Sequence, residues 1–355
     1  MRVVPAYRSL GAELGYRAER ARQALTACRL CGHACGVDRH RELGRCRTGT
    51  TAVVASYGPH HGEEAVLSGW RGSGTIFFSW CNLGCVFCQN ADLSQHGKGR
   101  KTAPAVLASV MLALQEQGCH NLNLVSPTHV LPMALEALAL ASAAGLELPL
   151  VWNTGGYESP QALALLDGVV DIYMPDMKYA DESVGRRLSA AADYPGVNRD
   201  AVREMHRQVG DLAVDREGLA RRGLLVRHLV LPEGLADTAR VAGFLANEIS
   251  PDTYLNLMAQ YHPCHRAREH SGLCLLYTSD AADDLLCVDL GGRRIIKKKN
   301  TQISQITHHH ITESLQSSLI SIQLHPSHII HTHHHAHTYS RHSHTHYSII
   351  AALTD

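Results

Sequence analysis

The sequence of 355 residues predicts an α/β protein, and three observations support that fold class. Short apolar runs alternate with segments of helical periodicity from residue 75 to residue 261. Each apolar run is nearly continuous, which is typical of parallel strands buried on both faces. Gly and Pro residues stand where the helical segments begin and end. Such a chain could form an open doubly wound sheet or an incomplete barrel, and periodicity does not decide between them.

The predicted strands are compact apolar runs, followed in most cases by a helix with recognisable boundary residues. The strands cover residues 75–80, 121–126, 148–154, 169–176, 224–232 and 253–261. The helices cover residues 102–118, 130–144, 159–166, 181–191, 199–209 and 237–249. Thr102 caps the first of these helices, Pro104 lies in its first turn, and Gly118 ends it. Gly145 ends the second helix, and Ser159 precedes a proline at the start of the third.

The N-terminal part precedes this alternation and differs from it. Residues 9–27 predict a helix, because leucines and alanines recur there at helical spacing. Residues 52–57 predict a short strand, whereas residues 58–74 and 210–223 predict irregular chain. We therefore divide the sequence into an N-terminal helix and Cys-rich metal-binding segment (1–70), an α/β domain (71–270) and a tail (271–355).

The tail has a composition unlike the rest of the chain. Thirteen of the 25 histidines lie in residues 308–346, and the alternation of strands and helices stops near residue 271. Such low complexity predicts a disordered segment. Residues 275–300 look like a peptide translated from a sequencing-library adapter, so we expect the tail to be non-native.

Charge and hydropathy exclude several classes of protein. The 33 basic and 33 acidic residues balance, which gives no electrostatic reason to expect a nucleic-acid or membrane partner. No apolar run reaches the roughly 18–20 residues that span a bilayer. The N-terminus lacks the apolar stretch and cleavage site of a signal peptide. We expect a cytoplasmic monomer.

Seven of the eleven cysteines fall into two clusters, at residues 28–46 and 81–88. Clustered cysteines in a reducing compartment favour metal binding or catalysis over disulfides. The second cluster, "CNLGCVFC", places Cys81, Cys85 and Cys88 directly after the first predicted strand. Three such thiolates could hold three irons of a 4Fe-4S cube and leave the fourth iron open. The alternative is a zinc site that a distant His or Cys completes.

The C-x3-C-x2-C spacing, with the aromatic Phe87 before the last cysteine, resembles the radical S-adenosylmethionine (SAM) superfamily. Several further segments, among them "WNTGGYES", "DIYMPDMKYAD" and "TYLNLMAQYHPC", resemble the branch related to pyruvate formate-lyase activating enzyme, in its form with a Cys-rich N-terminus. The resemblance covers residues 25–270. It implies a partial (β/α)6 barrel, TIM-like in architecture, in which a cluster with an open iron binds and reductively cleaves SAM.

The resemblance also implies which residues contact the cofactor. Where the family has a Gly-Gly-Glu-like stretch for the amino group of SAM, this chain has "SPTH", so we expect Ser126 and Thr128 to substitute. The remaining candidates, at or near the ends of later strands, are Asn153, Asp176, Lys178 and Arg227. These four could equally form a salt-bridged polar layer at the barrel mouth.

The first cluster contains Cys28, Cys31, Cys35 and Cys46. Four thiols could close a structural zinc site or a second, auxiliary iron–sulfur cluster, and the spacing does not identify the metal.

The sequence predicts an oxygen-sensitive radical SAM oxidoreductase. By resemblance, its substrate is a glycyl-radical enzyme of the formate-lyase type, and its reductant is a donor such as flavodoxin or ferredoxin. Two alternatives stay open. The radical could act on another peptide or a small molecule, or the chain could be a non-catalytic iron–sulfur or zinc protein.

Overall fold

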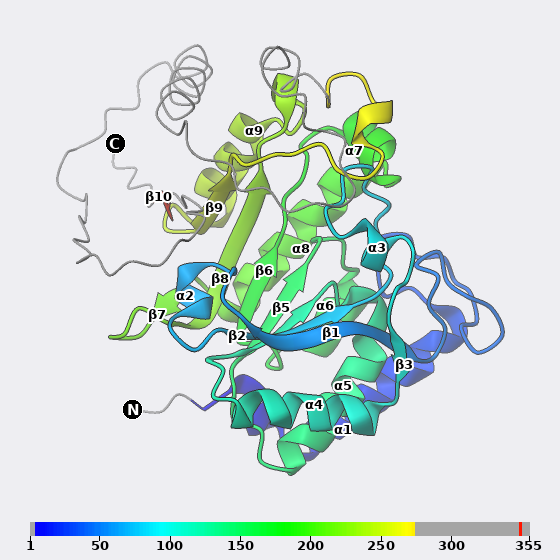
Figure 1. Cartoon of the computed structure of the whole chain (residues 1–355), viewed down its shortest axis with the longest axis vertical. Coiled ribbons are helices and arrows are strands. Elements are labelled where there is room, and N and C mark those ends of the chain that lie inside the picture. Colours follow the sequence, from blue (N-terminus) through cyan, green and yellow to red (C-terminus); the bar gives the residue numbers. More distant parts are fainter. Residues whose placement is uncertain (1–3, 274–347, 350–355) are drawn as a thin grey trace, which may run out of the picture. The chain divides into compact units, whose positions relative to one another are not determined.

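The computed structural model describes residues 4–273 and 348–349, and its centre is a curved, mostly parallel sheet (Figure 1). The strand order is β10-β9-β8-β6-β5-β4-β2-β1-β3, with β7 paired to β8. From β2 to β9 the parallel strands follow one another in chain order and every pairing is parallel. A doubly wound sheet would reverse its strand order at a switch point. The fold is therefore a partial TIM-like barrel, as the sequence resemblance predicted.

The strands are β1 (Ala52–His60), β2 (Ser73–Phe78), β3 (Arg100–Thr102), β4 (Leu122–Val125), β5 (Leu150–Thr154), β6 (Ile172–Pro175), β7 (Ala213–Val214), β8 (Ala220–Leu229), β9 (Tyr254–Met258) and β10 (Ser348–Ile349). The helices are α1 (Ala12–Gln23), α2 (Ala65–Ser68), α3 (Ala91–Ser94), α4 (Pro104–Glu116), α5 (Leu131–Ala143), α6 (Pro160–Leu166), α7 (Glu182–Ser189), α8 (Tyr194–Val209) and α9 (Thr238–Phe244). A π-helical turn (Leu245–Ile249) extends α9. Short 3-10 helices cover Ala6–Leu10, Ala24–Ala27, Thr128–Val130, Pro232–Gly234 and Ala267–Glu269.

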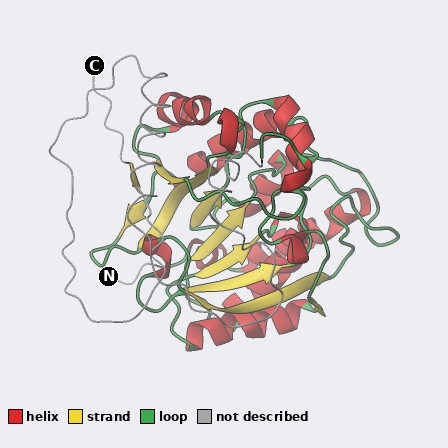
Figure 2. Ribbon diagram, turned by 45° about the horizontal axis from the view of Figure 1, so that its top comes forward, coloured by secondary structure: helices red, strands yellow, loops and turns green. Residues whose placement is uncertain are grey.

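Helices cover one face of the sheet (Figure 2), and alternate side chains along the strands separate two apolar regions. Trp152 and Tyr173 face the helices and join the main core between helices and sheet. Val151 and Ile172 face the other way, where Leu67 of α2 packs against them inside the barrel. The period-two pattern of strands thus places one set of residues under the helices and the other in the barrel interior.

Two segments predicted as irregular chain are ordered instead. Within residues 58–74, β1 continues to His60 and pairs antiparallel with β2, and α2 follows. Within residues 210–223, β7 and the start of β8 form a hairpin, whose turn the Asp215 carboxylate stabilises by accepting from two backbone N–H groups. The first prediction failed because pairing with a segment beyond a long connection leaves little local pattern, and the second because β7 has only two residues.

The helix predicted over 199–209 begins earlier, at Tyr194. Pro195 occupies its first turn, where a missing N–H costs nothing. Tyr194 is fully buried and its hydroxyl donates to the carbonyls of Gly155 and Asp176. The extra turn therefore joins α8 to the strand ends.

One side-chain hydrogen bond links the two ends of the parallel run. Glu64, just before α2, accepts from the Asn256 amide of β9 at 2.8 Å. Glu64 is 5% exposed and Asn256 4%. Because β1 and β2 lie at one end of the parallel run and β9 at the other, this contact spans the open side of the barrel.

The Cys-rich segment is held against the barrel by one buried arginine. Arg39 is 3% exposed and donates to the carbonyls of Thr48, Gly49 and His129. A buried guanidinium needs this many acceptors to offset its desolvation. Arg39 therefore fixes the loop around the first cysteine cluster to the start of α5.

The tail lies almost wholly outside the described residues, so the predictions about it are untested. Of that segment the structure describes residues 271–273 and β10, which pairs antiparallel with β9. Among the described residues no helix has both the length and the apolar character needed to cross a membrane.

The chain turns sharply between β2 and the second cysteine cluster. Trp80, next to Cys81, has a left-handed φ of 69°, and its N–H donates to the Leu93 carbonyl. A β-carbon on Gly97, where φ is 66°, would lie 2.2 Å from the Trp80 ring. Only glycine allows this close approach, so Gly97 helps to set the position of Cys81.

We expect Gly97→Ala to destabilise the protein by roughly 2–4 kcal/mol, because it adds a steric clash to the strain of a positive φ. Gly218→Ala is the matched control: its φ is 78° and a β-carbon there would meet nothing within 4 Å. It should cost only about 1 kcal/mol. Chemical denaturation of both variants checks this, and equal losses would contradict the role given to Trp80.

Candidate active site

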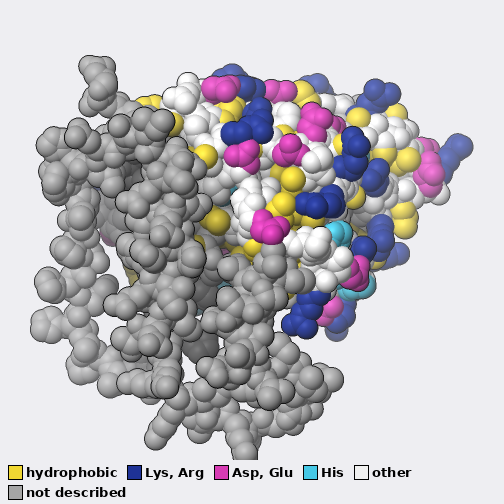
Figure 3. Space-filling view, turned by 90° about the horizontal axis from the view of Figure 1, so that it is seen from above, with side chains coloured by type: hydrophobic (Ala, Val, Ile, Leu, Met, Phe, Trp, Pro, Cys, Tyr) yellow, Lys and Arg dark blue, Asp and Glu magenta, His cyan; other side chains and the backbone are white. Residues whose placement is uncertain are grey.

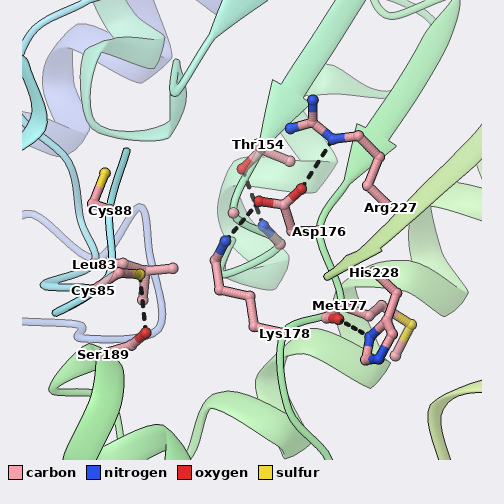
Figure 4. A network of polar contacts seen from close by, with 12 residues as sticks. Leu83, Cys85, Cys88, Thr154, Asp176, Met177, Lys178, Ser189, Arg227 and His228 are labelled. Carbon is pink, nitrogen blue, oxygen red and sulfur yellow. Dashed lines mark hydrogen bonds and ion pairs between the residues drawn. The ribbon is translucent and has the colours of Figure 1, made fainter. Parts of the chain in front are cut away.

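Three thiols lie in one loop at the carboxyl end of β2. Cys85 is buried, whereas Cys81 and Cys88 are partly exposed. The Cys85 sulfur lies 2.9 Å from the Ser189 hydroxyl at the end of α7 (Figure 4). The Cys88 sulfur lies 3.1 Å from the Ser94 hydroxyl. Hydroxyl contacts of this kind orient the sulfurs, and they leave further lone pairs for a metal.

Burial keeps the Cys81 and Cys85 thiols protonated without a cation. Burial is the main reason why the pKa of Cys81 is raised to about 12, and the charges of Cys85 and Cys88 contribute to the rise. Burial also raises the pKa of Cys85, although the Lys178 ammonium opposes the effect. The three sulfurs are thus close enough to sense one another's charge, and as thiolates they need a positively charged group among them.

The donor set fits the cluster that the sequence predicts. Among the described residues, no three His, Cys, Asp or Glu side chains converge on the position of a single metal ion. In a 4Fe-4S cube each thiolate binds its own iron, so the sulfurs need not share one point. Three soft donors on one loop therefore suit a cube better than a single zinc ion.

A charged network occupies the ends of the next strands. The Asp176 carboxylate lies 2.6 Å from the Lys178 ammonium and accepts from the Arg227 Nε at 3.0 Å (Figure 4). Arg227 also donates to the Asn153 side-chain oxygen at 2.7 Å. The structure thus gathers four of the predicted cofactor residues from three neighbouring strands.

The two cations fix the ionisation of this network. Burial opposes ionisation of Asp176, but Lys178 and Arg227 outweigh it and hold the pKa of this carboxyl below its usual value. Burial alone would lower the pKa of Lys178 and of Arg227, yet Asp176 raises both. All three groups are therefore charged at neutral pH, so the strand ends offer fixed charges of both signs.

A cavity of about 210 Å³ joins the cysteine loop to this network. Its lining residues come from the loop, from the charged strand ends and from apolar positions on or near β8 and β9: Phe87, Gln89, Asn90, Asp176, Lys178, Arg227, Leu229, Leu231 and Met258. Phe87 packs edge-on against Tyr179 and Tyr261, which holds its ring at the cavity wall. Phe87 of the cysteine loop, the two residues that follow Cys88 and the fixed charges of the strand ends thus line one cavity.

The structure places the two predicted amino-group contacts differently. Ser126, directly after β4, is partly buried and has a left-handed φ of 56°. Thr128 is 1% exposed, and its hydroxyl donates to the Glu158 carboxylate at 2.6 Å. Because Glu158 also accepts from Trp152 on the helix-facing side of β5, the Thr128 hydroxyl belongs to a buried outer network. Whether either residue contacts a cofactor stays a prediction.

Sequence reasoning missed a set of buried polar groups inside the barrel. Glu63 lies 3.9 Å from Arg227, beside Glu64. Asn123 is fully buried, and neither of its side-chain polar atoms has a hydrogen-bond partner. It alternates with Leu122 and Leu124 of the helix-facing core, so it faces the barrel interior. The sequence could have indicated Asn123, because it is a single Asn within an apolar strand. No local pattern indicates that Glu63 lies inside the barrel, because its position depends on contacts with distant segments.

The first cysteine cluster is also gathered in space. Burial is the main cause that raises the pKa of Cys31 to about 12, and the charges of Cys46, Cys28 and Cys35 contribute to the rise. The backbone of Cys31 forms an isolated antiparallel β-bridge with that of Glu158. Cys35 is exposed. The four thiols lie near one another, and binding of zinc or of an auxiliary cluster stays a prediction.

Charge is mixed over the face seen in Figure 3. Basic and acidic side chains alternate across its described part. The equal totals of the whole sequence agree with this arrangement.

The sequence is similar to one protein family and to an archaeal protein. A sequence model of the radical SAM superfamily matches residues 75–215. The chain is 32% identical over 267 residues to the uncharacterized protein MJ0674 of Methanocaldococcus jannaschii, and the match covers 72% of each protein.

Similar solved structures are more distant. SuiB of Streptococcus suis, solved with S-adenosylmethionine bound, is 9% identical with a TM-score of 0.39; the match covers 67% of this chain and 46% of SuiB. TYW1, solved with a lysine-pyruvate adduct bound, is 13% identical with a TM-score of 0.34, over 53% of this chain and 65% of TYW1. The chain therefore spans less than two thirds of either protein.

The buried Glu63 makes stability depend on pH. Burial, reinforced by Glu64 and opposed by Arg227, raises its pKa from 4.5 to about 7. Between pH 4.5 and about pH 7 the folded state therefore binds a proton that the unfolded state has released. The stability that this proton contributes is complete below pH 4.5 and is lost as the pH rises through 7.

We expect Glu63→Gln to remove this dependence. Relative to wild type, the variant should gain roughly 2 kcal/mol of unfolding free energy between pH 5 and pH 8. Urea denaturation at both pH values measures the difference, with the exposed Glu116→Gln as control. If the Glu63→Gln and wild-type profiles run parallel, Glu63 is not a protonated interior group.

Proposed function

The chain belongs to the radical SAM superfamily, and from that premise we propose that this radical SAM enzyme abstracts a hydrogen atom from a glycine of a partner enzyme. One observation carries the radical chemistry: the loop of Cys81, Cys85 and Cys88 borders the same cavity as the charged ends of the later strands. The resemblance of several motifs to the activating enzyme of pyruvate formate-lyase supports the choice of substrate.

Cys81, Cys85 and Cys88 would hold three irons of a 4Fe-4S cluster, and the open iron would take the methionine end of SAM. When bound, cluster and SAM supply a 5′-deoxyadenosyl radical, at the expense of one electron and the carbon–sulfur bond of SAM. The glycine Cα–H bond then breaks. Its hydrogen passes to the 5′ carbon, and the unpaired electron stays on the glycine.

The chain's own residues would bind and shelter the reactants. Asp176, Lys178 and Arg227 present fixed charges of both signs, which suit the charged amino-acid end and the ribose hydroxyls of SAM. Asn153 holds Arg227 in place. Phe87 closes the apolar side of the cavity against water. We propose these four polar residues and Phe87 as the cofactor-binding set.

Replacing any of the three cysteines with Ala should abolish SAM cleavage, because the cluster would lose one of its three ligands. We expect Cys81→Ala, after anaerobic reconstitution and reduction with dithionite, to form at least about 100-fold less 5′-deoxyadenosine than wild type. Chromatography of the product measures it. Cys119→Ala, in the core next to α4, is the control and should keep its activity. Equal activity in Cys81→Ala and wild type would remove the basis of the proposal.

The partner substrate needs a separate test. Incubation with SAM, reductant and a glycyl-radical enzyme should produce a glycyl radical, seen by electron paramagnetic resonance as a doublet that collapses when the glycine is deuterated at Cα. 5′-Deoxyadenosine formed without this signal would favour the alternative in which the radical acts on another peptide or small molecule.

A further inference from the structure

A second and larger cavity lies between the Cys-rich segment and the α7–α8 junction. Its volume is about 460 Å³. Its lining residues come from both segments and from Tyr157 after β5: Gly32, His33, Arg45, Tyr157, Arg186, Ala190, Ala191, Ala192 and Asp193. It shares no lining residue with the cavity of the candidate active site. Nothing in the proposed reaction uses it.

This cavity lies against the cysteine loop. Ala190 on its wall follows Ser189, whose hydroxyl contacts the Cys85 sulfur at 2.9 Å and whose carbonyl accepts from the Gly84 N–H. On the other wall, His33 lies 2.7 Å from the carbonyl of Asn82. In Figure 4, Ser189 and Lys178 approach the loop from different directions. No residue of the loop lines the larger cavity, but residues on or next to its wall contact the loop directly.

The charges of this cavity favour an acidic partner. Between Cys28 and Gly49 the sequence has five arginines and two acidic residues, although the whole chain is balanced. Arg45 and Arg186 line the cavity and are exposed. The acidic residue on the wall, Asp193, accepts a hydrogen bond from the Tyr157 hydroxyl. The Arg45 guanidinium donates to the Ala190 carbonyl at 3.0 Å, which holds it at the cavity wall. Exposed arginines on a cavity wall suit carboxylates of an approaching protein.

We propose that the cavity around Arg45 and Arg186 is the docking site for an acidic, low-potential electron-transfer protein. The inference rests on the proposed function, because that reaction consumes one electron for each SAM cleaved. The reduced donor loses this electron at the docking site, and Ser189 and Asn82 connect the site to the cysteine loop. The SAM cavity stays free, so donor and SAM bind at the same time. Weak, charge-steered contact is usual for electron-transfer partners.

Binding tests the site without catalysis. We expect oxidised flavodoxin, an acidic flavoprotein, to bind the wild-type protein more weakly at about 200 mM than at about 50 mM salt. Arg45→Glu and Arg186→Glu should each raise the dissociation constant at least tenfold at the lower salt concentration, in titration calorimetry with or without reconstituted cluster. Arg216→Glu is the control, because it reverses an exposed arginine in the β7–β8 turn, far from α7 in Figure 1.

Activity separates this proposal from the proposed function. With flavodoxin as reductant, Arg45→Glu and Arg186→Glu should each form 5′-deoxyadenosine at least tenfold more slowly than wild type. With dithionite as reductant, both variants should form it at the wild-type rate. Unchanged affinity in both variants overturns the docking site, and so does an equal loss with both reductants. A wild type inactive with dithionite contradicts the proposed function instead, while the binding titration still tests the docking site.

Discussion

The mutual repulsion that three clustered thiolates would feel is the constraint on which the site depends. As thiolates, Cys81, Cys85 and Cys88 would each raise the energy of the others. All three can therefore be deprotonated together only around a cationic group. The surroundings keep the sulfurs together nonetheless. Ser189 and Ser94 contact two of them, and Trp80 fixes the backbone before the first.

The order of the sheet adds the second half of the site. Because the parallel strands follow one another in chain order, their carboxyl ends meet at one edge, next to the loop after β2. Asn153, Asp176 and Arg227 come from successive strands at that edge and bind one another there. Cysteine loop and charged network are thus brought together by topology, although they are separated by up to about 140 residues in the sequence.

Much of this arrangement could be predicted from the sequence, since it rests on local patterns. Apolar runs and helix boundary residues located the parallel strands, and the cysteine spacing located the loop. The chain order of the strands supports the barrel over the doubly wound sheet, which periodicity had left open. Asp176, at the end of a predicted strand, and Arg227, within the next strand, were chosen through the family resemblance and not from a local pattern.

Most of the failures share a physical cause, which is contact between distant segments. The β1–β2 pairing and the buried position of Glu63 depend on partners that no local pattern identifies. The β7–β8 hairpin is local, but β7 has only two residues, too few to form a pattern. Within the site, the Thr128 hydroxyl donates to Glu158, thirty residues further along the chain, and its contact with a cofactor stays a prediction.

The link between Glu64 and Asn256 bears on how reactants arrive. The cavity of about 210 Å³ is smaller than the roughly 300–1,000 Å³ of most ligand pockets, so loading requires part of the wall to move. At its lateral gap the described wall is joined by the Glu64–Asn256 hydrogen bond, the Glu63–Arg227 contact and the packing of Phe87 on Tyr261, where a closed barrel would have a full ladder of backbone bonds. These contacts could separate sideways and widen the chamber while every strand pairing stays intact.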